Sequence, residues 1–423
     1  MQKCAIWSLV LGLAVLGGNV RSDENWPRFR GPTGLGDTTE RNLPITWGGP
    51  KQENIRWKAP LVGRGLASPI VWGQRLFACT GIWEGNLVEH HVLCYDARDG
   101  KLLWDSKVAP GPLRPGDIRG LRGEGYAGPT PTTDGKLVYC VFGSAVLAAL
   151  DFQGKIAWRK ELLPWQSFDV IVGSSPVLYQ DTLIYLFAMN RKQDSKVVAY
   201  DKQSGAVRWQ RQMPDMDFAH STPVIIEVRG KPQMLISSAG CFHNDPAALQ
   251  SLDPADGKRL WWCWGQGEVP SPAVGAGIVY FDSGRGGPGV AVDPTGRGDV
   301  TATHTRWKID QVASSLSSPI VVGDCLYRLQ ESGVLRCWKA ASGKPLYAER
   351  LDGITSKWAS PIADPNGNIF FASGGKSFVI QAGPKFKVLA VNDLGDSNHA
   401  SPAVAGGNMF LVGAKNVYCI GKK

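Results

Sequence analysis

The sequence lacks the features that mark several common classes of protein. Its one long apolar run, residues 5–17, is shorter than the roughly 20 residues of a membrane-spanning helix. It has no C-x-x-C pair and no two adjacent cysteines, which argues against zinc ribbons and thioredoxin-type sites. Its cations lie singly or in pairs such as Arg191-Lys192, so the net charge of +9 forms no cluster that would bind nucleic acid.

Short catalytic motifs are also missing. The sequence contains neither the H-E-x-x-H pattern of zinc hydrolases nor the G-x-S-x-G pattern of serine hydrolases. The glycine-rich stretch from Ser283 to Gly289 leads into a valine-rich, strand-like run, whereas a phosphate-binding loop opens a helix. We therefore expect no catalytic residues and no metal site.

The sequence is instead rich in glycine and proline, with 51 Gly and 28 Pro among 423 residues. Such a composition suits many short strands joined by tight turns and works against a helical bundle. A single hydrophobic core stops growing at roughly 250–300 residues, so the chain must form several domains or a repeat array.

A small hydroxyl residue followed by proline, apolar residues and a turn recurs along the chain. The eight copies are Ser68-Pro69, Thr130-Pro131, Ser175-Pro176, Thr222-Pro223, Ser271-Pro272, Ser318-Pro319, Ser360-Pro361 and Ser401-Pro402. A period of about 40–50 residues built from short strands is typical of a β-propeller. The repeat therefore predicts eight blades.

Each copy contains the parts of a four-stranded antiparallel blade. Its third strand ends in a small residue, an apolar residue and Asp, as in Ala149-Leu150-Asp151, and a glycine turn leads to a fourth strand with an aromatic residue. A large flat side chain at this position would fill the wedge between neighbouring blades. The tryptophans expected to pack in this way are Trp57, Trp104, Trp158, Trp209, Trp261 and Trp307.

The last copy is incomplete, because the chain ends soon after the strand Asn416–Ile420 and lacks a fourth strand. Residues 54–58, near the other end, read as a fourth strand without a blade. Pairing the two would close the ring and remove exposed strand edges. The sequence thus predicts an all-β, eight-bladed propeller whose C-terminal blade is completed by an N-terminal strand.

The first residues read as a secretory signal peptide. Lys3 precedes the apolar run, and Val20-Arg21-Ser22 offers small residues at the positions of a cleavage site. We expect a signal peptide over residues 1–22, an extension over 23–52 and a single propeller domain over 53–423. The mature protein would be a secreted or periplasmic monomer with no transmembrane span.

Eight cysteines follow residue 22, and their pairing cannot be deduced from the sequence. Cys94, Cys337 and Cys419 occupy the small-residue position that alanine or serine fills in other copies. We expect these three to be buried as small apolar side chains.

The repeat resembles a known family. The runs from Asp96 to Trp104 and from Asp253 to Trp261 are similar to the tryptophan-docking motif of pyrroloquinoline-quinone-type propellers. That superfamily includes quinoprotein dehydrogenases and the propeller lipoprotein of the outer-membrane assembly machinery. The opening run 26–32 and the closing run 388–395 resemble a secreted branch common in planctomycete-like bacteria. Quinone-binding relatives often carry an adjacent-cysteine disulfide and a calcium held by Glu, Asn and Asp.

Extra loop length is predicted on one face of the ring, which we call the long-loop face. The long segments are Thr80–His90, Pro110–Ala127, Met189–Lys196 and Ala239–Ala248. They join second to third strands or one blade to the next, and these connections share a face. Insertions gathered on one face of a repeat array indicate a binding surface, although neutral drift in exposed loops is the alternative.

Two groups of residues are candidates for ligand binding. The 110–127 segment supplies Arg114, Arg119, Arg122 and Tyr126, and the residues that precede the proline markers supply Arg64, His220, Glu268, Lys357, Trp358 and His399. The two histidines lie four blades apart, on opposite walls of an eightfold ring, so they cannot ligate one metal at ~2 Å. We expect them to act as hydrogen-bonding residues.

Two functions from different classes remain open at this point. The first is a non-catalytic scaffold outside the cytoplasm that binds a protein or a glycan through the long-loop face, without a cofactor. The second, implied by the resemblance, is a quinone-dependent dehydrogenase that binds pyrroloquinoline quinone and calcium at the channel mouth. The sequence supplies neither adjacent cysteines nor an identifiable calcium-binding set for the second.

Overall fold

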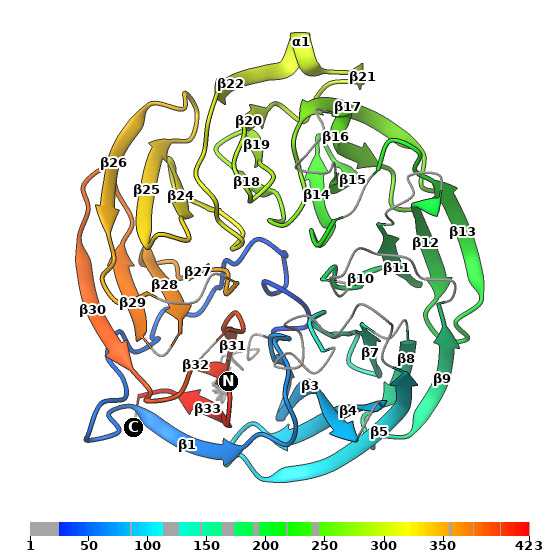
Figure 1. The fold of residues 1–423 in the computed structure, drawn as a ribbon, viewed down its shortest axis with the longest axis vertical. Coiled ribbons are helices and arrows are strands. Elements are labelled where there is room, and N and C mark those ends of the chain that lie inside the picture. Colours follow the sequence, from blue (N-terminus) through cyan, green and yellow to red (C-terminus); the bar gives the residue numbers. More distant parts are fainter. Residues whose placement is uncertain are drawn as a thin grey trace, which may run out of the picture.

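The computed structural model describes residues 25–84, 87–112, 127–143, 146–162, 173–188, 194–216, 219–238, 245–354, 358–374, 376–397 and 399–422. Eight sheets, each with four antiparallel strands, stand as blades around a central channel (Figure 1). Helix is almost absent from the described residues, where α1 (Thr301–His304) is a single turn. The predicted eight-bladed, all-β propeller is confirmed.

The first four blades run in chain order. Blade 1 is β2 (Ile70–Trp72), β3 (Arg75–Glu84), β4 (Leu87–Asp96) and β5 (Leu102–Pro112). Blade 2 is β6 (Thr132–Thr133), β7 (Leu137–Phe142), β8 (Val146–Asp151) and β9 (Ile156–Glu161). Blade 3 is β10 (Val177–Tyr179), β11 (Thr182–Phe187), β12 (Lys196–Asp201) and β13 (Val207–Gln212). Blade 4 is β14 (Val224–Val228), β15 (Lys231–Ser237), β16 (Asp245–Leu252) and β17 (Arg259–Gly265).

The remaining blades follow the same order. Blade 5 is β18 (Ala273–Gly275), β19 (Ile278–Phe281), β20 (Gly289–Val292) and β22 (Thr305–Ile309). Blade 6 is β23 (Ile320–Val322), β24 (Cys325–Leu329), β25 (Val334–Lys339) and β26 (Pro345–Arg350). Blade 7 is β27 (Ile362–Ala363), β28 (Asn368–Ser373), β29 (Lys376–Gln381) and β30 (Val388–Asp393). Blade 8 is β31 (Ala403–Ala405), β32 (Asn408–Val412), β33 (Asn416–Ile420) and β1 (Ile55–Pro60).

Burial along a blade follows the position of each strand in the ring. The third strand β8 is buried at nearly every residue, because neighbouring blades cover both of its faces. The fourth strand β9 alternates between partly buried and exposed residues, since it forms the rim of the ring. The core is therefore a series of apolar layers between blades, and the first strands surround the channel.

The N-terminal strand closes the ring as predicted. β1 pairs antiparallel with β33, with Trp57 opposite Cys419 and Lys58 opposite Tyr418. β1 lies on the outer side of the C-terminal strands (Figure 1). The last blade thus takes its fourth strand from the beginning of the chain, and β1 covers the edge of β33 that would otherwise be unpaired.

The outer-strand tryptophans reach into the next blade. Trp57 Nε1 donates to the carbonyl oxygen of Ala97 at 3.0 Å. A Cβ added to Gly100, whose φ is +77°, would lie 2.6 Å from the indole of Trp57. The repeated glycine is therefore needed both for its backbone conformation and for space. Equivalent hydrogen bonds join Trp104 to Phe152, Trp158 to Lys202 and Trp307 to Ala340.

Two tryptophans depart from this pattern. The ring of Trp209 packs against Gly257, but within the described chain its Nε1 has no hydrogen-bond partner. Trp261 is fully buried and donates to Gln233 Oε1 in its own blade at 2.8 Å. The turn that it would meet in blade 5 is replaced by α1 and β21 (Gly298–Asp299), which pairs parallel with β17.

The prediction of a loop over Thr80–His90 is wrong. This segment forms the ends of β3 and β4, which remain paired from Arg75 opposite Asp96 to Glu84 opposite Leu87. β-branched and aromatic residues such as Ile82 and Trp83 continue the strand beyond the height of the ring. The expected loop 239–248 likewise overlaps β16, which begins at Asp245.

The described cysteines are all free and buried. They are Cys79, Cys94, Cys140, Cys263, Cys325, Cys337 and Cys419. The three cysteines in the small-residue position have at most 1% of their surface exposed, as expected for small apolar side chains. Nowhere in the described part of the chain is there a helix both long enough and apolar enough to span a membrane.

Candidate binding site at the centre of the ring

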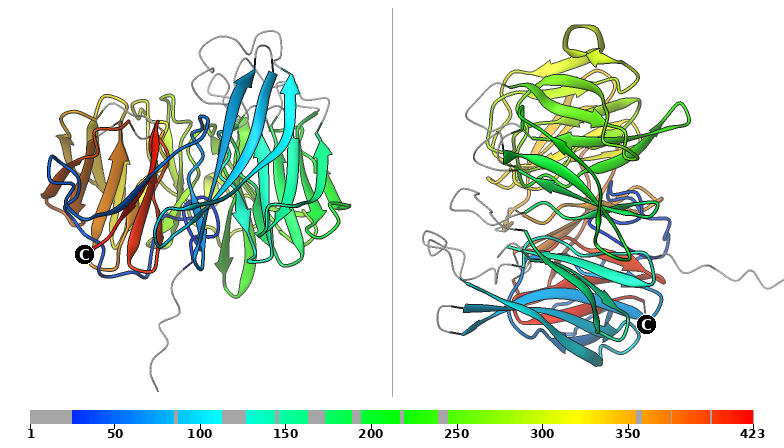
Figure 2. Two further views of the ribbon diagram at one scale, coloured as in Figure 1. Left: turned by 90° about the horizontal axis from the view of Figure 1, so that it is seen from below. Right: turned by 90° about the vertical axis from the view of Figure 1, so that its right-hand side faces the viewer.

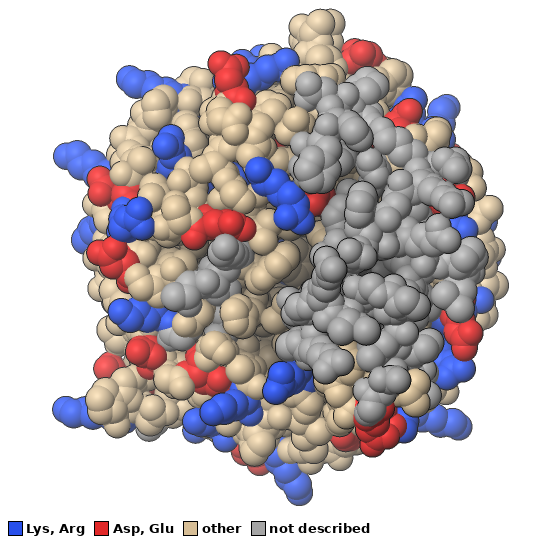
Figure 3. All heavy atoms as spheres, viewed as in Figure 1, with Lys and Arg blue, Asp and Glu red and all other residues tan. Residues whose placement is uncertain are grey.

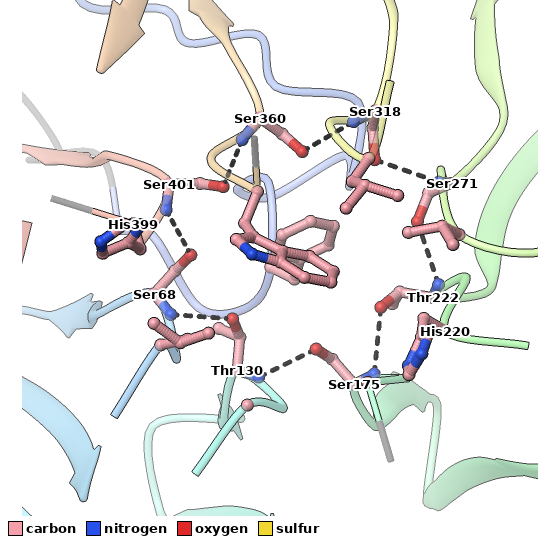
Figure 4. A pocket seen from close by; sticks show the side chains of 17 residues that line it. Ser68, Thr130, Ser175, His220, Thr222, Ser271, Ser318, Ser360, His399 and Ser401 are labelled. Atoms are coloured by element: carbon pink, nitrogen blue, oxygen red, sulfur yellow. Dashed lines mark hydrogen bonds between the residues drawn. The ribbon is translucent and has the colours of Figure 1, made fainter. Parts of the chain in front are cut away.

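The hydroxyl residues of the repeat form a closed ring of hydrogen bonds around the channel (Figure 4). The backbone N–H of each one donates to the side-chain oxygen of its counterpart in the next blade, at distances of 2.8 to 3.1 Å. The series runs from Ser68 to Thr130 and onward, and Ser401 N–H donates to Ser68 Oγ to complete the circle. All members are buried.

This ring explains why the marker is a hydroxyl residue followed by proline. A buried backbone N–H needs an acceptor, and the neighbouring hydroxyl supplies one. The next position needs none, because proline has no N–H. In the sequence alone, the pair indicates only the number of blades. The signal that could have revealed its role is that every copy carries Ser or Thr and none carries Ala or Val.

The ring lines a cavity of about 150 Å³, which we call the cup. Apolar, glycine and histidine positions complete its wall. Besides the eight hydroxyl residues, the cup is lined by Phe29, Leu66, Gly128, Gly173, His220, Val269, Leu316, Trp358 and His399. Trp358 is 37% exposed, so its indole is the large apolar group at the open end.

The N-terminal segment closes the cup on the side away from the projecting β3–β4 hairpin (dark blue in Figure 2). Trp26 exchanges two backbone hydrogen bonds with Val71 in blade 1, and Arg30 donates to the carbonyl oxygen of Pro319 at the entry to blade 6. Gly36 accepts from Ala363 N–H in blade 7. In blade 2, Thr133 N–H donates to the carbonyl oxygen of Pro27. Blades 2 and 6 lie on opposite sides of the ring, so the segment between Pro27 and Arg30 crosses the channel, and its Phe29 forms the floor of the cup.

The described lining of the cup is electrically neutral. It contains no carboxylate, ammonium or guanidinium group. Burial, aided by the positive charge of Arg285, lowers the pKa of His220 to about 4, and burial also lowers the pKa of His399. Both imidazoles are therefore neutral at pH 7. The described lining thus offers a set of hydroxyl and imidazole groups without an acid–base pair.

The two histidines lie on opposite sides of the cup, as the repeat spacing predicts (Figure 4). Within the described ranges, no group of three or more His, Cys, Asp or Glu residues is placed to hold a metal ion. The arrangement can bind a small uncharged group, and the lowered pKa values of its two histidines make their neutral imidazoles weak bases.

Of the other predicted site residues, two are described and lie outside the cup, and five lie outside the described residues. Arg64 is exposed and its backbone pairs with Gly81, while Glu268 is buried and its carboxylate accepts from Arg285 Nε at 2.6 Å; neither lines the cup. Those that lie outside the described residues are Arg114, Arg119, Arg122, Tyr126 and Lys357.

The clearest departure from eightfold symmetry among the described residues is the hairpin of β3 and β4. Each strand has ten residues, and the pair rises above the rest of the ring on the long-loop face (Figure 2). His91 Nδ1 lies 2.6 Å from Asp105 Oδ1, and Lys107 forms an ion pair with Glu89, so polar and charged side chains on β4 and β5 pair with one another. At the tip, Leu87 is 46% exposed beside the partly buried Trp83.

Charges on the long-loop face are mixed. Figure 3 shows lysine, arginine and acidic side chains scattered over the coloured part of this face, with uncharged residues along the coloured side of the central hollow. Among the coloured residues no large area carries one sign. This agrees with the absence of clustered cations in the sequence.

Comparison with known proteins adds three findings. The family described as outer membrane protein assembly factor BamB matches residues 89–227 and 226–419. The structure of BamB from Moraxella catarrhalis superposes with a TM-score of 0.57 at 14% identity, covering 85% of this chain and 97% of that one. A europium-containing methanol dehydrogenase superposes with a TM-score of 0.51 at 11% identity, covering 92% and 89%.

A further match is to part of a protein named as a dehydrogenase. A Paracoccus denitrificans protein named as a dehydrogenase, XoxF, is 29% identical over 160 residues, which is 36% of this chain. The chain spans about a quarter of the length of that relative, since the match covers 25% of it. The structural likenesses are shared folds at low sequence identity.

Proposed function

The chain belongs to the family of the outer membrane protein assembly factor BamB, and from this premise we propose that it is a non-catalytic scaffold outside the cytoplasm. It binds a protein or glycan partner through its long-loop face. The family name refers to protein assembly, which favours a protein partner. The neutral cup supports a binding role, because its described lining holds no acid–base pair.

The observation that carries this proposal is the projecting β3–β4 hairpin. Strands in the same positions of the other blades have four to eight residues, whereas β3 and β4 have ten each. Leu87 is an exposed apolar side chain at its tip. A rigid element that carries an apolar group away from the core is a common anchor in protein interfaces.

The proposal is tested by capture from envelope extract. Full-length protein is compared with a tip variant, Trp83→Ser with Leu87→Ser, and with Val391→Ser. Val391 is 54% exposed on β30, at the rim of the ring, so it controls for loss of an exposed apolar side chain. We expect the wild type and the control to recover the same partner and the tip variant to lose it. Recovery that is unaffected by the tip would contradict the proposal.

Location outside the cytoplasm rests on residues 1–22, which lie outside the described residues. We propose that they are removed on export. Cell fractionation followed by N-terminal sequencing tests this, with Asp23 expected as the new first residue. Retention of residues 1–22 in a cytoplasmic fraction would contradict it.

A second candidate, a quinone-dependent dehydrogenase, is favoured by the match to XoxF and by the shared fold of methanol dehydrogenase. Pyrroloquinoline quinone is a planar tricyclic molecule with three carboxyl groups. The described lining of the cup offers no cation for these carboxylates and no carboxylate for calcium, and its volume of about 150 Å³ suits one small ring. The described residues of the cup do not fit this group.

The second candidate has a direct test. Purified protein is titrated with pyrroloquinoline quinone and Ca²⁺, and alcohol oxidation is followed with a dye as electron acceptor. Saturable quinone binding together with dye reduction would overturn the scaffold proposal. Absence of both would leave the scaffold as the function of this chain.

A further inference from the structure

The size of the cup limits what can enter it. Its volume of about 150 Å³ equals that of protein cavities that hold a single benzene-sized ring. The N-terminal segment forms its floor, so an occupant must enter from the long-loop side. An extended peptide or a tricyclic ring system is too large to be enclosed, whereas one six-membered ring can enter with its substituents directed to the open side.

The hydroxyl ring sets the polarity of the occupant. Each hydroxyl oxygen accepts one backbone N–H, which leaves its own proton for another acceptor. Within the described chain no hydrogen bond donated by these eight hydroxyls is seen. A purely apolar ring would bury those donors without partners. The occupant should therefore carry oxygen atoms around its edge.

The rest of the lining determines two further properties of the occupant, its apolar surface and its charge. Phe29, Leu66, Val269, Leu316 and Trp358 supply apolar surface, including two aromatic faces on which the C–H face of a saturated ring can pack. The described lining has no charged group, and its histidines are neutral, so an ionised ligand would lose its hydration without gaining a partner. The occupant should be uncharged.

We propose that the cup binds one neutral hexopyranose, a sugar ring with apolar faces and a hydroxylated edge. The ring could belong to a free sugar or to the end of a glycan chain, because the cup contacts only one unit. This site goes beyond the scaffold role, because binding of a sugar in the cup does not depend on which partner binds the β3–β4 hairpin.

The test uses purified full-length protein and titration calorimetry with methyl glycosides of glucose, galactose and mannose. D-glucuronate serves as the charged counterpart and benzene as the apolar one. We expect saturable binding of at least one methyl glycoside, at least tenfold tighter than glucuronate or benzene. Maltotriose, cellotriose and the matching monosaccharides distinguish a glycan end from a free sugar.

Variants assign the binding to the cup. Trp358→Ala should weaken glycoside binding at least tenfold, and Trp358→Phe should retain most of it because an aromatic face remains. Val391→Ala, on the outer strand β30, should bind as the wild type does. Thermal melting checks that each variant is folded.

Several results would overturn the sugar site. These are absence of saturable glycoside binding, glucuronate or benzene binding as tightly, or Trp358→Ala binding unchanged. None of them bears on capture of a partner through the hairpin tip, so failure of this site and failure of the scaffold proposal are separately visible.

Discussion

His90 shows how one buried side chain makes the stability of this fold depend on pH. It is fully buried, stacks on Phe142 with ring centroids 4.5 Å apart, and in the described structure neither ring nitrogen has a hydrogen-bond partner. Burial, with a smaller contribution from the charge of His91, lowers the pKa of His90 to about 3. The imidazolium form is therefore strongly disfavoured in the folded state.

The sign of the pH effect follows from this depressed pKa. In the unfolded chain His90 titrates near its ordinary value of about 6.5, so acid protonates the unfolded state first. The resulting loss of stability begins as the pH falls below about 6.5 and is complete near the folded pKa of about 3. At pH 5 this single residue lowers the free energy of unfolding by about 2 kcal/mol relative to pH 7.

We expect His90→Phe to remove this loss, because phenylalanine has no proton to bind. Urea denaturation at pH 7 and pH 5 should show a smaller difference in the free energy of unfolding for the variant, by about 2 kcal/mol. Its stability at pH 7 serves as the internal reference for any change in packing. An equal pH difference in both proteins would mean that His90 is not the group responsible.

Arg328 and Asp282 form an ion pair in which both side chains have 0% exposure. The guanidinium donates twice to the carboxylate, at 2.8 and 2.9 Å, and also to the carbonyl oxygen of Ala313. Removing the charge of Asp282 leaves a buried cation without its counter-ion. We expect Asp282→Asn to lower the free energy of unfolding by about 3–5 kcal/mol.

Asp215→Asn is the matched control for this pair. Asp215 pairs with Arg259 at 2.6 Å but is 38% exposed, so water screens the interaction and replaces it easily. The control should change the free energy of unfolding by about 0–1 kcal/mol. Urea denaturation of both variants checks the difference, and equal losses would show that burial of Asp282 is not what matters.

The sequence anticipated the positions of individual residues better than their partners. The repeat correctly placed His220 and His399 on opposite sides of the cup, because a proline marker fixes the blade and the level in the channel. It did not reveal the Arg328–Asp282 pair, whose members are 46 positions apart in different blades. Contacts between blades depend on packing across the wedge, which a pattern within one copy does not contain.

At the scale of the structural element, the glycine turn after the third strand is the part that joins one blade to the next. Gly100 has φ +77° and its hydrogen faces the indole of Trp57. Gly277 has the same φ of +77° in a hairpin turn, with no atom near the position of a Cβ. The two glycines therefore share a backbone φ, and a tryptophan lies against the Cβ position of Gly100 alone.

We expect Gly277→Ala to cost about 1–2 kcal/mol, the strain of a left-handed alanine. Gly100→Ala should cost a further 1–3 kcal/mol or so, because its methyl group displaces the indole. Thermal or urea denaturation of the two variants measures the difference. Equal losses would contradict the view that close packing on tryptophan selects the glycine of the repeat.

The element scale also shows where prediction from the sequence failed. The sequence predicts four strands per copy and an aromatic residue on the fourth, because alternation and turns are local patterns. The extended β3–β4 hairpin was assigned to a loop, because its extra residues break the length of the repeat without breaking strand propensity. The insertion that contains α1 similarly replaces the turn of blade 5 that would accept a hydrogen bond from Trp261. The motif shared by the copies does not predict this change.

At the scale of the whole molecule, the beginning of the chain acts at two places. Its first part crosses the channel and forms the floor of the cup, and β1 then completes blade 8. The hydroxyl ring also joins blade 8 to blade 1 at the channel, because Ser401 N–H donates to Ser68 Oγ. Closure was predictable because the last copy lacks a strand, and residues 23–52 were expected to form an extension over the ring. That Phe29 would form the floor of the cup was not predictable, because residues 25–37 carry no repeat pattern.

These two roles can be separated by truncation. A chain beginning at residue 38 lacks the floor but keeps β1, and a chain beginning at residue 61 lacks both. The first should remain a closed monomer, because β33 is still paired. The second leaves β33 with an unpaired edge and removes Trp57 from its contact with blade 1. Such an edge pairs readily with another chain.

We therefore expect the chain from residue 61 to associate as its concentration rises and to unfold at a clearly lower urea concentration than the chain from residue 38. Light scattering coupled to size exclusion measures the first effect, and urea denaturation measures the second. Full-length protein should run as a monomer at all concentrations. If the chain from residue 61 is monomeric and as stable as the chain from residue 38, closure by β1 contributes little. The hydroxyl ring, which both truncated chains retain, would then be the element that holds blade 8 to blade 1.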